Sequence, residues 1–227
     1  MVSIAGRFAA VRAQLRDAEN AAGRLPGSVQ LLAVSKTKPA ADLAAVYRLG
    51  QRHFGENYLQ EALKKQQQLA AFDISWHFIG PIQSNKTRPI AENFAWVHSV
   101  DRLKIAERLS EQRPDHLPPL NICLQVNISD EATKSGISLA ELPDLVRQVE
   151  QLPRLRLRGV MAIPEPAADF EAQRIPYRRL YQAATALHRP QLDTFSFGMS
   201  GDLLAAVTEG ATLVRIGTAL FGARPSQ

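Results

Sequence analysis

Residues 193–216, DTFSFGMSGDLLAAVTEGATLVRI, contain two short apolar runs on either side of a helical pattern. The runs at 193–197 and 213–216 are short, apolar and bounded by turn residues, which predicts two buried strands. Between them we expect a short helix that starts at Asp202 and ends at Gly210. A strand, a helix and a second strand in this order are typical of a parallel βαβ unit.

The same alternation extends toward the N-terminus. Further strands are expected at 31–36, 53–56, 75–79, 95–99, 120–128 and 155–163, each followed by a helical pattern, and a first amphipathic helix is expected over about residues 3–22. Ser84 and Asp101 are candidate N-caps, and Ser138 with Glu141 forms a capping box.

Strands alternating with helices, without a break in composition, predict one α/β domain over residues 1–227. The expected fold is a single (β/α)8 TIM-type barrel with an extra N-terminal helix. An open doubly wound sheet is the alternative. No G-x-G-x-x-G motif follows the first strand and no Walker A motif is present, so neither nucleotide-binding pattern supports that alternative.

Composition narrows the functional classes. The 227 residues include no apolar run of about 18 residues, so no membrane-spanning helix is expected, and the N-terminal segment lacks the apolar core of a secretory signal. The single cysteine, Cys123, excludes an internal disulfide and favours a reducing cytoplasm. The net charge of +5 is modest, and acidic residues are interleaved with the arginines of 147–189, so no nucleic-acid partner is expected.

Candidate chemistry lies where barrel strands end. Lys36 follows the apolar run at 31–35, and partial desolvation at a barrel rim favours the neutral amine that forms Schiff bases. A solvent-facing lysine is the plainer interpretation of Lys36, and it is the preferred one for Lys38. The loop at 198–202 and Gly217 offer backbone N–H groups to an anion. Because loops after the last two strands commonly bind phosphate, these features together indicate a phosphate-bearing aldehyde.

Several motifs then carry a specific resemblance. They are AVSKTKP (33–39), HFGENYLQEALKK (53–65), WHFIGPIQSNK (76–86), VNISDEATKSGI (126–137), RGVMAIPE (158–165) and FSFGMSGDLLAAVTEGATLVRIGTALFG (195–222). In this order they closely resemble the pyridoxal phosphate homeostasis family, single-barrel relatives of the N-terminal domain of alanine racemase. The resemblance extends from the first helix to Gly222.

The resemblance implies that pyridoxal 5′-phosphate (PLP) is bound covalently, as an aldimine on Lys36. It implies further cofactor-binding positions that do not form the covalent bond: Asn57, Met161, Met199, Ser200, Arg215, Gly217 and Thr218.

Within this set, Ser200, Gly217 and Thr218 match phosphate-binding positions, and Arg215 matches the arginine that faces the pyridine nitrogen. Asn57 and Met161 match positions that line the cofactor, and Met199 lies beside the phosphate serine.

The resemblance also implies a carrier rather than an enzyme. Two-base racemisation needs a proton donor on each face of its intermediate, and Lys36 would supply one. Alanine racemases take the other from a tyrosine of a C-terminal β domain, which we do not expect after the eighth strand here. Arg215 can only donate hydrogen bonds, so it would weaken the electron sink of PLP, although alanine racemase works with the same feature.

We therefore expect a PLP-binding protein without catalytic residues that acts in intracellular PLP homeostasis. It would buffer PLP, deliver it to PLP-dependent apo-enzymes and influence amino-acid and keto-acid balance, acting as a cytoplasmic monomer. Three alternatives remain: an amino-acid racemase that uses Lys36 with water or a rim tyrosine, an aldolase-type barrel that uses Lys36 without a cofactor, and a weak electrostatic binder of nucleic acid.

Other polar residues have plainer interpretations. The histidines show no metal-ligand spacing, so no metal is expected. His77 alternates with Trp76 and Phe78, which favours a core histidine with satisfied hydrogen bonds. Glu56 is expected to be structural or to lie at the rim. Residues 83–86 fit either a loop that closes over the site or a helix cap.

Overall fold

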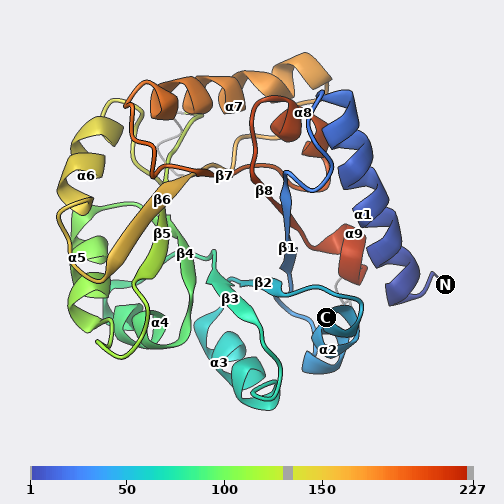
Figure 1. The fold of residues 1–227 in the computed structure, drawn as a ribbon, viewed down its shortest axis with the longest axis horizontal. Coiled ribbons are helices and arrows are strands. Elements are labelled where there is room, and N and C mark those ends of the chain that lie inside the picture. The colour runs from blue at the N-terminus through green and yellow to red at the C-terminus, as the bar shows by residue number, and fades with distance from the viewer. Residues whose placement is uncertain (1, 130–134, 224–227) are drawn as a thin grey trace.

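The computed structural model describes residues 2–129 and 135–223, and in it the strands form one closed parallel barrel in sequence order. Figure 1 looks into the barrel and shows the helices as an outer ring. The strands are β1 (Gln30–Val34), β2 (His53–Glu56), β3 (Ser75–Phe78), β4 (Trp96–Val100), β5 (Leu120–Gln125), β6 (Leu155–Met161), β7 (Thr194–Ser196) and β8 (Leu213–Ile216). The helices are α1 (Ile4–Ala21), α2 (Ala40–Arg48), α3 (Leu59–Gln68), the 3₁₀ turn η1 (Ser84–Lys86), α4 (Thr87–Asn93), α5 (Leu103–Gln112), α6 (Leu142–Val149), α7 (Phe170–Thr185), α8 (Leu203–Thr208) and α9 (Thr218–Phe221).

This architecture confirms the predicted (β/α)8 barrel with an extra N-terminal helix. The extra helix, α1, runs beside α8 and α9 on the outside of the barrel (Figure 1). It buries Val11 and Leu15, and the Arg7 Nε donates to the Leu220 carbonyl at 3.0 Å. The helix therefore covers the seam where β8 pairs with β1.

The strands have two differently composed faces, because successive side chains of a strand point to opposite sides. Outward residues such as Leu31 and Ala33 join the main core beneath the helices. Inside the barrel, Leu32 packs with Ile79 and Leu213 in a small apolar cluster. Polar side chains, including His77, His98 and Arg215, occupy other interior positions.

Element boundaries depart from the sequence predictions in a few places. β1 ends at Val34, so Lys36 lies beyond the strand. Ser84 does not cap a helix but begins η1. Asp101 does not cap α5 either, because it pairs with the neighbouring Arg102 guanidinium. The reciprocal hydrogen bonds predicted between Ser138 and Glu141 are present, one turn before α6.

The structure also bears on the strand predicted at 120–128 and on the expectation that no helix spans a membrane. The strand predicted at 120–128 is shorter than expected, because β5 ends at Gln125 and Val126 forms only an isolated bridge with Ile137. Residues 130–134 of the motif VNISDEATKSGI lie outside the described residues. Among the helices that the structure describes, none combines the length and apolar character needed to cross a membrane.

Candidate functional site at the mouth of the barrel

Lys36 lies just beyond the carboxyl end of β1, where it is half-buried. It lines a small cavity of about 30 Å³ together with Gly217 and Thr218, which follow β8. The two segments meet because β1 pairs with β8. A side chain at position 217 would lie 3.3 Å from the Val34 carbonyl oxygen, so a glycine permits this close approach. The structure thus brings three of the predicted site residues together.

The backbone on either side of Lys36 is anchored by α3. The Lys65 ammonium donates to the Ser35 carbonyl at 2.7 Å, and the Thr37 N–H donates to the Glu61 carboxylate at 2.6 Å. Thr37 has a φ of 63°, a left-handed conformation that is uncommon for a threonine. These bonds hold the backbone on both sides of Lys36 in one conformation.

Lys65 is itself held by a buried carboxylate. Its ammonium lies 2.8 Å from Glu56, which also accepts a 2.5 Å hydrogen bond from the Ser35 hydroxyl. Glu56 is fully buried, and burial raises its pKa despite the opposing Lys65 charge. Glu56 is therefore structural, as expected. Sequence reasoning missed Glu61 and Lys65, although their four-residue spacing on one helix face was a usable signal.

Lys38 differs from the plain surface charge that was expected. It is half-buried, and its ammonium donates to the carbonyls of Gly222 at 3.0 Å and Ala223 at 2.7 Å. The lysine thereby ties the β1 loop to the segment after α9.

The loop after β7 carries Met199 and Ser200. Gly198 has a φ of 88°, and its carbonyl accepts from the Arg215 N–H at 3.0 Å, which keeps the loop against β8. Ser200 and Thr218 are exposed at the rim. Because α8 has six residues and α9 four, an anion here would rely on loop N–H and hydroxyl groups rather than on a long helix dipole.

Met199 is not brought into the Lys36 cavity. It is 40% exposed and lines a separate pocket of about 220 Å³ with Pro164 and Gln173. Met161 is fully buried at the end of β6, in register with Ser196 of β7. Since neighbouring residues in register share a face of the sheet, Met161 and Ser196 both point into the barrel.

Arg215 is buried inside the barrel with only 4% of its surface exposed. One guanidinium nitrogen donates to the Ser196 carbonyl and, at 2.8 Å, to the Ser196 hydroxyl, and the other donates to the Ala162 carbonyl at 2.9 Å. Burial lowers the pKa of Arg215 from its ordinary value, and the nearby Tyr177 and Asp202 oppose that shift. The side chain is fixed by these acceptors on β6 and β7.

Three histidines continue from Ser196 through the barrel. The Ser196 hydroxyl lies 2.8 Å from His98 Nδ1, His98 Nε2 lies 2.8 Å from His77 Nδ1, and His77 Nε2 lies 3.0 Å from His53 Nδ1. His77 is thus a buried histidine with satisfied hydrogen bonds, as predicted. The described residues hold no cluster suited to a metal ion. Sequence reasoning missed that these histidines form one chain.

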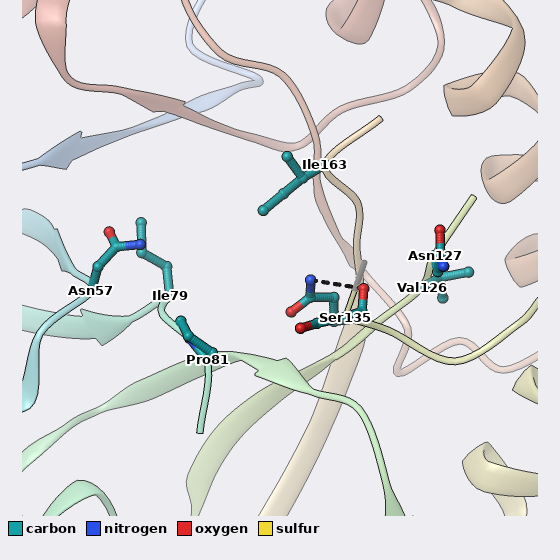
Figure 2. A pocket seen from close by; sticks show the side chains of 8 residues that line it. Asn57, Ile79, Pro81, Val126, Asn127, Ser135 and Ile163 are labelled. Atoms are coloured by element: carbon teal, nitrogen blue, oxygen red, sulfur yellow. Dashed lines mark hydrogen bonds between the residues drawn. The ribbon is translucent and has the colours of Figure 1, made fainter. Parts of the chain in front are cut away.

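Asn57 borders a larger pocket of about 320 Å³ at the barrel mouth. Val34 is in register with Gly55, so Asn57 and Lys36 each lie two residues beyond a registered pair. Figure 2 shows Asn57, Ile79 and Pro81 on one side of this pocket, with Ser135 and Ile163 facing them. None of the described lining residues has a side chain that ionises near neutral pH.

One atom of this pocket wall has an unmet hydrogen-bonding capacity. The Asn57 Oδ1 is buried and accepts no hydrogen bond within the described part of the chain. Buried acceptors are normally satisfied, so this oxygen suits a donor group of a ligand at the mouth.

The chain is similar in sequence to a known family and to named relatives. Residues 7–225 match the model of the alanine racemase N-terminal domain. The chain is 64% identical over 224 residues to a pyridoxal phosphate homeostasis protein of Pseudomonas aeruginosa, covering 99% of this chain and 97% of that one. It is 52% identical over 229 residues to the protein of the same name from Escherichia coli, covering 99% and 98%.

Solved structures show the same fold. PipY of Synechococcus elongatus with PLP bound is 40% identical, with a TM-score of 0.84 over 97% of this chain and 100% of that chain. Alanine racemase of Corynebacterium glutamicum is 17% identical, with a TM-score of 0.67 over 96% of this chain and 62% of the racemase, and this likeness concerns the fold alone.

Proposed function

Because the chain belongs to the pyridoxal phosphate homeostasis proteins of the alanine racemase N-terminal domain family, we propose that it binds PLP through Lys36. The observation that carries this proposal is the cavity that Lys36 shares with Gly217 and Thr218. The PipY structure with PLP bound supports the same assignment, since it shares the fold at 40% identity.

The residues at the mouth fit the chemical groups of PLP. The Lys36 amine suits covalent attachment to the aldehyde, and the hydroxyls of Ser200 and Thr218 with the Gly217 backbone suit the phosphate. Arg215 would donate to the pyridine nitrogen. Asn57 and Met161 would border the ring. Met199 would contribute only from the rim, because it is 40% exposed on the loop after β7.

A carrier role agrees better with this site than a two-base enzyme. Bound PLP supplies an electron sink for carbanions, and the sink is strongest when the ring nitrogen is protonated. Arg215 is a donor only and would hold that nitrogen unprotonated. Across the mouth, the described lining residues offer amides, a hydroxyl and apolar groups rather than a second base. The relatives are likewise named homeostasis proteins rather than enzymes.

We extend the proposal to the cellular role. The protein would buffer PLP, release it to PLP-dependent apo-enzymes and so influence amino-acid and keto-acid balance. It would act as a monomer in the cytoplasm, a compartment that suits a chain whose single cysteine is free and buried.

The direct test is the visible absorption band of lysine-bound PLP. After reconstitution with PLP and borohydride reduction, mass spectrometry of peptides should place the added mass on Lys36. Lys36→Ala should abolish the band, and Lys104→Ala, which removes an exposed lysine of α5, should retain it. A band that persists in Lys36→Ala would remove Lys36 from the central role.

A racemase is the second candidate, favoured by Tyr58, which is 52% exposed directly after Asn57. It predicts exchange of the Cα hydrogen of alanine or serine with deuterated solvent faster than free PLP achieves, and a loss of that exchange in Tyr58→Phe. Exchange no faster than that of free PLP supports the carrier.

A further inference from the structure

A chain of hydrogen bonds crosses the barrel interior from His53 at the start of β2 to Arg215 in β8. We call His53, His77, His98 and Ser196 the histidine chain. His77, His98 and Ser196 are fully buried, whereas His53 is half-buried at the end of the barrel opposite Lys36. Nothing in the proposed attachment of PLP to Lys36 uses these residues.

The two central histidines are neutral. Burial lowers the pKa of His77 well below its ordinary value, and burial together with the Arg215 charge lowers the pKa of His98 to about 3. A neutral imidazole carries one ring proton, so each ring donates through one nitrogen and accepts through the other. The hydrogen bonds of the histidine chain must therefore all be donated in one of two directions, toward Arg215 or away from it.

Arg215 selects the direction. Its guanidinium can only donate, so the Ser196 hydroxyl accepts from it and turns its own proton toward His98 Nδ1. His98 must then donate through Nε2 to His77 Nδ1, and His77 must donate through Nε2 to His53 Nδ1.

The reverse order would leave a buried proton unpaired. If His98 Nδ1 donated to Ser196, the Ser196 oxygen would accept twice, and its own proton would have no partner among the hydrogen bonds that this hydroxyl makes to the described residues, which are those with His98 and Arg215. A buried donor without a partner loses its hydrogen bond to water and gains none in return, so this arrangement is disfavoured. This cost favours the arrangement in which every hydrogen bond of the histidine chain is donated away from Arg215.

We propose that Ser196, His98 and His77 are positioning residues that orient the Arg215 guanidinium toward the ring nitrogen of PLP, a role that rests on the proposed function. The histidine chain would hold Arg215 through Ser196, and every proton of the histidine chain would point away from the guanidinium. Barrel interiors are usually filled by apolar side chains, and a satisfied polar network here specifies one rotamer of the arginine rather than several.

The first measurement is the tautomer of each buried histidine, by nitrogen-15 NMR of the full chain without PLP and with it. We expect the ring proton on Nε2 of both His77 and His98, with His77→Gln and His98→Gln used to assign the signals. A proton on Nδ1 of either ring, or a mixture, would overturn the direction.

The second measurement uses Ser196→Ala, which removes the hydroxyl but keeps the backbone carbonyl that also binds Arg215. It should abolish the preference for the Nε2 proton at His98, shift the PLP absorption band and weaken PLP binding by about tenfold, the effect of one hydrogen bond to a charged group. Ser196→Thr should restore all three properties. Ser110→Ala, which removes a buried hydroxyl that donates to the Pro153 carbonyl outside the barrel, is the matched control.

The outcomes separate the two proposals. Unchanged tautomers and unchanged PLP binding in Ser196→Ala would overturn the positioning role while leaving the proposed function intact. Failure of the unmodified protein to bind PLP would overturn the proposed function and the role at the ring, and the tautomers of the PLP-free protein would still decide the direction of the chain.

Discussion

Acidification from pH 7 to pH 5 should destabilise this protein through its buried histidines. The pKa of His98 is lowered to about 3 in the folded chain by burial and by the Arg215 charge. In the unfolded chain an ordinary histidine has a pKa of about 6.5. Between these values the unfolded chain binds a proton that the folded chain does not, so the free energy of unfolding falls as the pH drops.

The size of the effect follows from the two pKa values. The contribution of His98 is retained above pH 6.5, and its loss between pH 7 and pH 5 is about 2 kcal/mol. The loss continues down to about pH 3 and then stops, because the folded form also binds the proton there. His77 acts in the same direction, since burial lowers its pKa as well.

The assay is urea unfolding at several pH values, with the free energy of unfolding extrapolated to water at each. His98→Gln should lose about 2 kcal/mol less than the unmodified protein between pH 7 and pH 5. His116→Gln, which replaces an exposed histidine, should match the unmodified protein. Comparing the change with pH, rather than the stability itself, removes the direct effect of each substitution. Equal pH dependence in all three proteins would refute the reasoning.

Three further outcomes are expected. Lys65→Met leaves the buried Glu56 carboxylate without its ion-pair partner and should lower the free energy of unfolding by about 3 kcal/mol. Lys64→Met, at an exposed position, should change it little, and equal urea midpoints for the two variants would contradict this prediction. Gly80→Ala would force a methyl group against the Asn57 carbonyl oxygen and should lower the midpoint of thermal unfolding, while Gly201→Ala, in open space, should not. Burial raises the pKa of Cys123 to about 12, so a thiol reagent should label it only after denaturation, and rapid labelling of the native protein would be inconsistent with its burial.

Local patterns predicted the barrel because each strand and helix is specified by neighbouring residues. Alternating apolar runs and helical periodicity over 227 residues have few compact solutions, and the closed parallel barrel is one of them. Boundary details were less predictable. Asp101, for example, looked like an N-cap, but it pairs with Arg102 instead, a choice between two local partners that sequence does not decide.

At the candidate site, the sequence determined which chemical groups are present, and the structure determined which of them lie close together. Lys36 and Gly217 were predictable because each follows a strand, and Thr218 was predictable from the family resemblance. The closure of β8 on β1 puts all three at one cavity. The support of Lys36 by Lys65 and Glu61, and the link from Lys38 to the segment after α9, depend on contacts between residues distant in sequence.

The sequence by itself determined the fold and the family, because strand and helix periodicity and the order of the motifs are local properties of the chain. Only the tertiary structure decided that His53, His77, His98, Ser196 and Arg215 form one chain. They come from β2, β3, β4, β7 and β8, and no local pattern relates them. Their hydrogen bonds exist because closing the barrel brings the inward faces of these strands within reach of one another in the same buried space.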